Sequence, residues 1–212
     1  VDPALPSAAG GLTSDSVDHR ATLRKVSRRL IPFLFLLYVA AYLDRINVGF
    51  AQLQMKSALG FSDTVYGLGA GIFFIGYFLF EVPSNLILAR VGARIWIARI
   101  MITWGILSSA MAFVNTPASF YVLRFLLGVA EAGFFPGIAF FLSAWFPREY
   151  RTRMLAWFLV GIPASALVGN PLCVALLEMD GILGLAGWKW MFIMVSVPCV
   201  ILGLFVLKTL AD

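Results

Sequence analysis

Long apolar runs alternate with short polar and basic segments along the whole chain. A bilayer core roughly 30 Å thick needs about 20 consecutive apolar residues per helix, so each long run predicts one transmembrane helix. The predicted spans are residues 30–51, 65–89, 95–114, 120–146, 154–177 and 190–207. The pattern therefore predicts an all-α membrane protein built as a bundle of six transmembrane helices.

The composition agrees with this prediction. Hydrophobic residues make up 61% of the 212 residues and charged residues 13%, and the mean hydropathy is +0.91. These values lie outside the range of soluble globular domains. We therefore expect an integral membrane protein whose main partner is the lipid bilayer.

The segment before the first span differs from the rest of the chain. Residues 1–29 are rich in Ser, Ala, Gly and Pro, and then carry a basic cluster next to the first span. Such a segment has no apolar core of its own, so we predict a mobile tail over residues 1–29 and one six-helix domain over residues 30–212. The apolar run that follows is too long for a cleaved signal peptide.

Basic residues are distributed unevenly between the two ends of the predicted spans. Five lie in the tail, three follow the second span, three follow the fourth and one follows the sixth, whereas the opposite loops hold only Lys56 and Lys189. The positive-inside rule then predicts a cytoplasmic amino terminus. This distribution also explains the net charge of +5 without a nucleic-acid partner. Trp145, Trp188 and Trp190 lie near span ends, where we expect aromatic anchors.

Four of the charged residues within the apolar runs are the candidate functional residues. Asp44 and Arg45 lie in the first span, and Arg124 and Glu131 lie in the fourth. Charges inside a span cost a few kcal/mol each and usually face a cavity or a partner. We therefore predict a transport site. The alternative is a pair of buried salt bridges that only fixes the helix register, although burying charges for stability alone is seldom favourable.

Helical spacing divides these residues into faces. Two stripes repeat at i, i+4, i+7 and i+11, and they comprise Tyr38, Tyr42, Arg45 and Gly49 in the first span and Arg124, Gly128, Glu131 and Phe135 in the fourth. Asp44 points about 100° away from Arg45 at ~3.6 residues per turn. We therefore expect Asp44 and Arg45 to meet different partners, with the partner of Asp44 in the fourth span.

Several weaker candidates accompany the charges. Tyr38, Tyr42 and Tyr77 align with them and are candidate cavity contacts, although aromatic stripes in membrane helices are usually packing residues. We interpret Glu81 as a residue that makes a structural hydrogen bond between helices. Asn170 lies between a glycine and a proline, so it either lines a cavity or belongs to a broken helix. Gly128 and Gly133 predict close helix contacts, and Pro136 predicts a bend below the charged site.

Cysteine and histidine usage narrows the possible chemistry. His19 lies in the tail, so no predicted span contains a histidine for metal binding or for a serine and histidine protease. Cys173 and Cys199 lie in apolar spans without metal-ligand spacing, and we interpret them as packing residues. We expect no enzyme activity, no metal and no cofactor.

Four segments together resemble the anion:cation symporter family of the major facilitator superfamily, over about residues 28–208. They are Tyr42-Leu-Asp-Arg-Ile-Asn-Val-Gly-Phe50, Gly76-Tyr-Phe-Leu-Phe-Glu-Val-Pro-Ser-Asn85, Arg124-Phe-Leu-Leu-Gly-Val-Ala-Glu-Ala-Gly-Phe-Phe-Pro-Gly137 and Gly187-Trp-Lys-Trp-Met-Phe192. The resemblance implies the amino-terminal half of a twelve-helix transporter whose halves rock about a central cavity. It also implies a missing carboxy-terminal six-helix half, so we expect that this polypeptide alone does not transport.

The resemblance further assigns roles to individual residues. It implies that Arg45 and Arg124 bind the acidic group of a substrate, that Tyr42 and Tyr77 contact the cavity, and that Asp44 and Glu131 couple transport to protons. The chain departs from the superfamily pattern at Ala89, where an Asp usually precedes the Arg-x-Gly motif.

From these expectations we predict uptake of a small organic anion coupled to protons, in the inner membrane of a bacterium. The acids and the substrate carboxylate would compete for the arginines. The alternatives are an antiporter of organic phosphates or other anions, and a membrane sensor or scaffold without transport. The aromatic residues expected to line the cavity favour an aromatic or small apolar acid as the substrate. They are Phe73, Phe74, Phe134 and Phe135.

Overall fold

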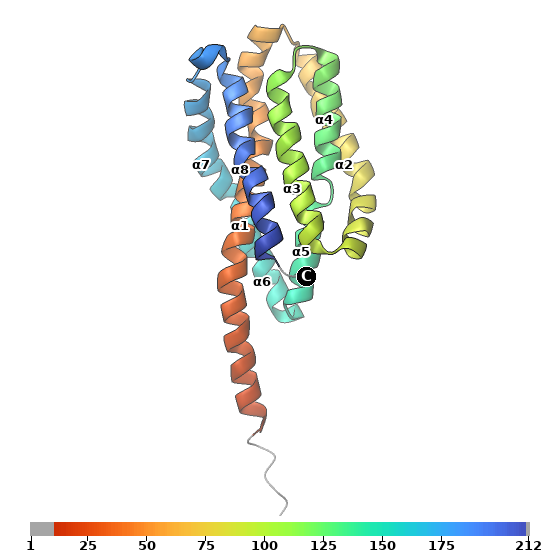
Figure 1. Cartoon of the computed structure of the whole chain (residues 1–212), viewed down its shortest axis with the longest axis vertical. Helices are drawn as coiled ribbons and strands as arrows, with labels where there is room; N and C mark the ends of the chain where they lie inside the picture. The colour runs from red at the N-terminus through yellow and green to blue at the C-terminus, as the bar shows by residue number, and fades with distance from the viewer. Residues whose placement is uncertain (1–10, 211–212) are drawn as a thin grey trace, which may run out of the picture.

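The computed structural model describes the backbone of residues 11–210, and the side chains from residue 27 onward apart from residue 29. Over this range the chain is helical except for short turns (Figure 1). The α-helices are α1 (Gly11–Leu59), α2 (Asp63–Val91), α3 (Ala93–Ala110), α4 (Pro117–Glu131), α5 (Phe134–Trp145), α6 (Arg148–Leu159), α7 (Gly161–Leu177) and α8 (Gly187–Thr209). Short 3-10 helices, η1 (Met111–Phe113) and η2 (Ile182–Gly184), occur in two of the connections.

Six stretches within this range are long and apolar enough to cross a membrane, which confirms the predicted number of spans. They are Leu30–Leu59, Asp63–Val91, Ala93–Phe113, Pro117–Trp145, Arg148–Leu177 and Gly187–Thr209. The first span is longer than predicted because helical structure continues past Ala51, through polar residues, to Leu59. The fourth and fifth spans each consist of two helices, α4 with α5 and α6 with α7.

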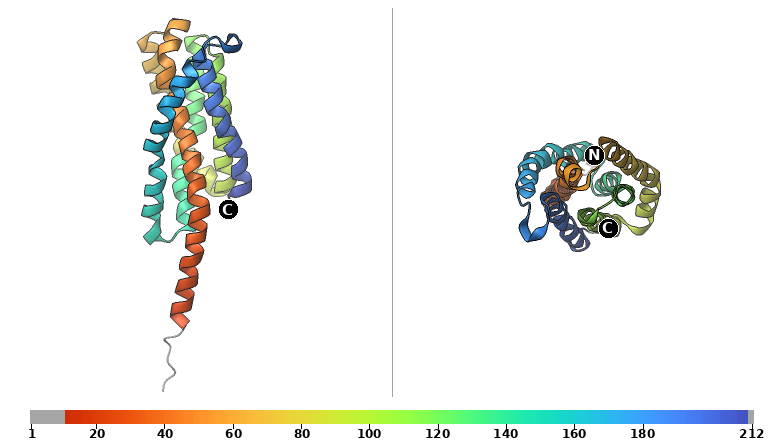
Figure 2. Two further views of the ribbon diagram at one scale, coloured as in Figure 1. Left: turned by 90° about the vertical axis from the view of Figure 1, so that its left-hand side faces the viewer. Right: turned by 90° about the horizontal axis from the view of Figure 1, so that it is seen from above.

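The predicted tail is described only from residue 11. Its backbone over residues 11–29 is helical and continuous with the first span, and it projects beyond the other helices at one end of the bundle (Figures 1 and 2). Residues 1–10 lie outside the described residues. The mobility of the tail and its cytoplasmic location stay predictions.

The helices run roughly along the long axis of one bundle, as the view down that axis shows (Figure 2). The most extensive helix pairs are α3 with α8 and α2 with α4, and α1 packs against α7 and α8. The helices α1 and α4, which carry the four candidate charges, are not among the extensively packed pairs in the described range. Of their charged side chains, Arg45 and Glu131 meet across the space between the two helices.

Two predicted glycine contacts are confirmed. A β-carbon at Gly128 would overlap the Phe73 carbonyl oxygen and lie 2.9 Å from the Tyr77 nitrogen. Only glycine therefore allows α4 to approach α2 so closely. Gly133 has φ +87° and faces Ser84 in the same close manner, so it needs glycine for its backbone conformation as well as for its contact.

The predicted bend in the fourth span occurs nearer the charged site than Pro136. The helix α4 ends at Glu131, Ala132 has φ −55° and ψ 128°, and α5 begins at Phe134. Pro136 contributes because it has no N–H to donate to the carbonyl of Ala132, four residues earlier. The break therefore directly follows Glu131.

The expected interfacial anchor Trp188 is buried instead, with 1% of its surface exposed. Its backbone nitrogen donates to the Gln54 side chain of α1, and its ring packs edge-on against Phe192. The indole therefore belongs to the core of the bundle. Trp145 remains partly exposed.

Candidate functional site

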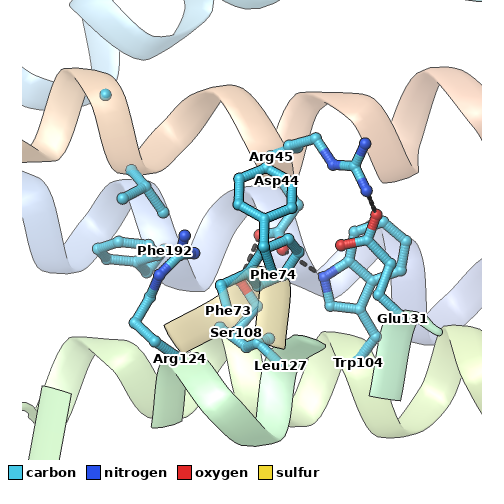
Figure 3. A pocket seen from close by; sticks show the side chains of 12 residues that line it. Asp44, Arg45, Phe73, Phe74, Trp104, Ser108, Arg124, Leu127, Glu131 and Phe192 are labelled. Atoms are coloured by element: carbon cyan, nitrogen blue, oxygen red, sulfur yellow. Dashed lines mark hydrogen bonds and ion pairs between the residues drawn. The ribbon is translucent and has the colours of Figure 1, made fainter. Parts of the chain in front are cut away.

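All four candidate charges line one cavity of about 250 Å³ in the middle of the bundle (Figure 3). Its lining residues are Asp44, Arg45, Val48, Gly49, Phe73, Phe74, Trp104, Ser108, Arg124, Leu127, Glu131 and Phe192. A second cavity of about 160 Å³ shares Arg45, Trp104 and Glu131 with the first. The two cavities are thus neighbouring parts of one site.

Arg45 and Glu131 form an ion pair across this site, between Nη2 of Arg45 and Oε1 of Glu131. The arginine side chain is 41% exposed, whereas the glutamate side chain is only 7% exposed. The Arg45 guanidinium also lies 5.9 Å from the ring centres of both Phe73 and Tyr77. Arg45 is therefore the accessible member of the pair, and it keeps donors that a ligand could reach.

Arg124 is held differently from Arg45. It is buried, its Nε donates to the carbonyl of Gly69 at 3.2 Å, and its guanidinium lies 4.6 Å from the centre of the Phe73 ring. Within the described range Arg124 forms no ion pair. It lines the cavity, so it offers a positive charge that an anion could neutralise.

The hydrogen-bond partners of Asp44 do not lie in the fourth span, contrary to the prediction, although Arg124 of that span interacts with Asp44 electrostatically. Trp104 donates its indole N–H to Asp44 at 2.7 Å, Ser108 donates its hydroxyl, and Asn47 donates at 3.4 Å. Trp104 and Ser108 both belong to α3. Because they are four residues apart, they share one helix face, and this face points at α1.

Neutral groups form the hydrogen bonds of the Asp44 carboxylate, which has no ion pair within 4 Å in the described part of the chain. Its three donors are neutral N–H and O–H groups, and charge-assisted hydrogen bonds of this kind are stronger than neutral ones. Asp44 is buried, with 6% of its surface exposed. It therefore differs from Glu131, which is neutralised by Arg45.

The three candidate tyrosines line the second cavity, together with Ala41, Arg45, Trp104, Glu131, Phe134 and Phe135. The rings of Tyr38 and Tyr42 lie 6.1 Å apart, and Tyr38 also stacks on Phe158 at 4.1 Å. Tyr38 therefore packs against the bundle while it lines the cavity. Glu81 and Asn170 line neither cavity.

Several lining residues were not singled out from the sequence. They are Val48, Trp104, Ser108, Leu127 and Phe192. A polar stripe of Trp104 and Ser108 in an apolar span is a signal that could have identified the donors to Asp44. Phe192 carries no comparable signal because it is one apolar residue in an apolar helix. Among the described residues, no group of three His, Cys, Asp or Glu side chains is placed to hold a metal ion.

The chain matches the family model described as "Major Facilitator Superfamily" over residues 34–212. Two Agrobacterium vitis proteins named "Putative tartrate transporter" are 59% and 63% identical to it, over 95% and 90% of the chain. The Escherichia coli K12 "Inner membrane transport protein RhmT" is 45% identical over 91% of the chain. The chain covers 45%, 44% and 45% of these relatives, so it spans about half of their length.

The fold is similar to solved transporter structures. A bacterial homologue of the human lysosomal transporter Spinster, in its inward-facing and occupied conformation, superimposes with a TM-score of 0.78 at 20% identity. The match covers 86% of this chain and 44% of that one, so it confirms a bundle that corresponds to half of the transporter fold. The chain is therefore an integral membrane protein of the Major Facilitator Superfamily, a family of transporters and not of enzymes, and it corresponds to the amino-terminal six-helix half.

Proposed function

We propose that the full-length protein takes up an organic acid anion together with protons, by alternating access, and that this chain forms one wall of the transport cavity. The full-length protein would contain a second six-helix half, because the chain spans about half of its relatives. The amino terminus would lie in the cytoplasm of a bacterial cell, with the bundle in the inner membrane. This location is supported by the Escherichia coli relative, which is named "Inner membrane transport protein RhmT".

The observation that carries this proposal is the grouping of two arginines and two acids around one intramembrane cavity. A cavity that only stabilised the fold would need every charge paired, because an uncompensated buried charge is costly. Arg124 instead lines the cavity without an ion pair in the described part of the chain. This supports the assignment of Arg124 and Arg45 as ligands for a substrate carboxylate.

The coupling mechanism follows from the pair between Arg45 and Glu131. While Glu131 is ionised, its carboxylate accepts a hydrogen bond from Nη2 of Arg45. Protonation removes the charge of Glu131 and frees Arg45 to bind a carboxylate through two parallel hydrogen bonds. Proton and anion then favour each other's binding, and this coupling is reciprocal.

Asp44 is the second proposed coupling acid. Trp104, Ser108 and Asn47 stabilise its ionised form, so its protonation would weaken the hydrogen bonds that join α1 to α3. Tyr42 and Tyr77 would contact the bound substrate from the second cavity, and Tyr38 would do so from the same wall.

Tartrate is the first substrate to test. Two relatives carry tartrate in their names, and a molecule with two carboxylates matches two arginines on one wall. The Phe73 ring lies beside both guanidinium groups, so the two arginines approach the same part of the cavity. This favours a small acid with separated polar ends.

The test is uptake of radiolabelled tartrate by the purified full-length protein in proteoliposomes. With an inward proton gradient and no internal anion, wild type should accumulate tartrate. Glu131→Gln should lose at least about 90% of this accumulation, roughly a tenfold effect, while tartrate exchange across equal pH persists. Uptake that requires an internal counter-anion would contradict the proposal and favour an antiporter.

Glu149→Gln is a matched control because Glu149 is an exposed acid in the first turn of α6. It should leave accumulation unchanged. Equal losses in both variants would show that removing an acid impairs the protein in general, and the role of Glu131 in coupling would then be rejected.

A further inference from the structure

The break in the fourth span leaves two carbonyl groups without their usual helical donors. Pro136 has no N–H for the carbonyl of Ala132, and the turn at Gly133 interrupts the helix next to Ala130. An unpaired carbonyl inside a bilayer is costly, so such groups need donors from neighbouring helices.

Two other helices supply these donors. Ser84 of α2 donates its hydroxyl to the Ala132 carbonyl at 2.6 Å, and the hydroxyl oxygen accepts the indole N–H of Trp96 of α3 at 3.0 Å. Arg99 of α3 donates to the Ala130 carbonyl at 3.4 Å. Two helices thus converge on the carbonyl groups of the residues on either side of Glu131.

The residues that hold the break also pack closely against one another. Ser84 is buried, with 4% of its surface exposed, and a β-carbon at Gly133 would overlap its hydroxyl. The Arg99 guanidinium lies 4.1 Å from the centre of the Trp96 ring. The serine hydroxyl thus donates to Ala132 and accepts from Trp96 at the same time.

Glu131 is the last residue of α4 and is joined directly to Ala132. Its side chain pairs with Arg45 on the opposite wall. Arg99 holds the peptide group that joins Ala130 to Glu131, and Ser84 holds the peptide group that follows Ala132.

We propose that Ser84 and Trp96 are positioning residues that form a latch on the break in the fourth span and hold Glu131 in the geometry that pairs it with Arg45. The latch itself follows from the hydrogen bonds at the break, whereas its effect on coupling rests on the proposed function. Neither side chain lines the transport cavities, so both act through Glu131 and not on the substrate.

The latch is tested directly by hydrogen exchange of the purified full-length protein. Ser84→Ala and Trp96→Phe should each increase amide exchange over residues 132–137 about tenfold, the effect of losing roughly one buried hydrogen bond. Trp96→Phe keeps an aromatic ring and tests the N–H alone. Unchanged exchange in both variants would overturn the latch, whatever the protein transports.

Ser165→Ala is the matched control. Ser165 is buried, and its hydroxyl donates to the Gly161 carbonyl of its own helix at 2.5 Å. This substitution removes a buried serine hydroxyl of the fifth span and should leave exchange over residues 132–137 unchanged. An equal increase there would show a general loosening of the bundle, and the latch would be rejected.

A second experiment tests the effect on Glu131. In proteoliposomes with labelled tartrate, Ser84→Ala should lower the ratio of pH-driven accumulation to exchange about tenfold. In a Glu131→Gln background the same substitution should change that ratio less than about twofold, because residues that act through one another are not additive. Additive losses would overturn the positioning role. Failure of wild type to accumulate tartrate would instead refute the proposed function and leave the exchange result to decide the latch.

Discussion

Replacing Arg45 with lysine tests whether a guanidinium fork, and not only a positive charge, binds the substrate. In the structure Arg45 is the exposed member of its ion pair, and it lies beside the rings of Phe73 and Tyr77. Lysine keeps the charge that neutralises Glu131, so we expect Arg45→Lys to fold. It cannot offer two parallel hydrogen bonds in a fixed geometry.

The magnitude follows from the loss of one of these two hydrogen bonds. A hydrogen bond to a charged group contributes about 1.5–3 kcal/mol, and each 1.4 kcal/mol is roughly tenfold in affinity. Arg45→Lys should therefore weaken tartrate binding about 10- to 150-fold.

The assay is the tartrate concentration that half-saturates exchange in proteoliposomes at equal pH on both sides. Equal pH removes the contribution of proton coupling from the comparison. Arg90→Lys is the matched control, because Arg90 is exposed in the last turn of α2. A half-saturating concentration within about twofold of wild type for Arg45→Lys would remove Arg45 from the substrate site.

Two further predictions concern the fold and its orientation. Gly128→Ala should lower the thermal unfolding midpoint by roughly 2–10 °C, since overpacking costs about 1–3 kcal/mol and the new β-carbon would overlap the Phe73 carbonyl. Gly71→Ala, whose β-carbon meets no atom within 4 Å, should leave the midpoint unchanged. Equal midpoints for the two variants would contradict the close packing of α2 and α4. In intact cells, an impermeant maleimide should label Ala118→Cys but not Thr152→Cys, and both positions are exposed. The two cysteines of this chain are buried and should give little background labelling. The reverse labelling pattern would place the amino terminus outside the cell.

The six spans could be predicted from the sequence because a bilayer requires long apolar helices, and composition alone reveals them. The two charged stripes could also be predicted, since helical periodicity determines which residues share a face. Arg45 and Glu131 needed only the further assumption that their faces meet in the bundle.

The partners of Asp44 could not be predicted in the same way. The angle between Asp44 and Arg45 showed that they face different neighbours, but which helix lies there depends on the packing of α1 against the rest of the bundle. Trp104 and Ser108 reach Asp44 from α3, whereas the sequence prediction looked for a charged partner in the fourth span.

The position of the break in the fourth span illustrates a similar limit of local patterns. Pro136 predicted a bend, and its missing N–H does free a carbonyl. The turn itself occurs at Gly133, where a positive φ and the contact with Ser84 coincide. The neighbouring bond from Ser84 to Ala132 joins residues 48 positions apart. A local sequence pattern therefore cannot predict it.

The central claim is that one anion and protons cross the membrane together, and simultaneous recording of both fluxes tests it most directly. Proteoliposomes that contain the full-length protein and a pH-sensitive dye, with no pH gradient and no internal anion, would receive external tartrate. The account predicts that the interior acidifies as labelled tartrate enters, and that Glu131→Gln abolishes this acidification. Tartrate entry with no change of internal pH in wild type would contradict it.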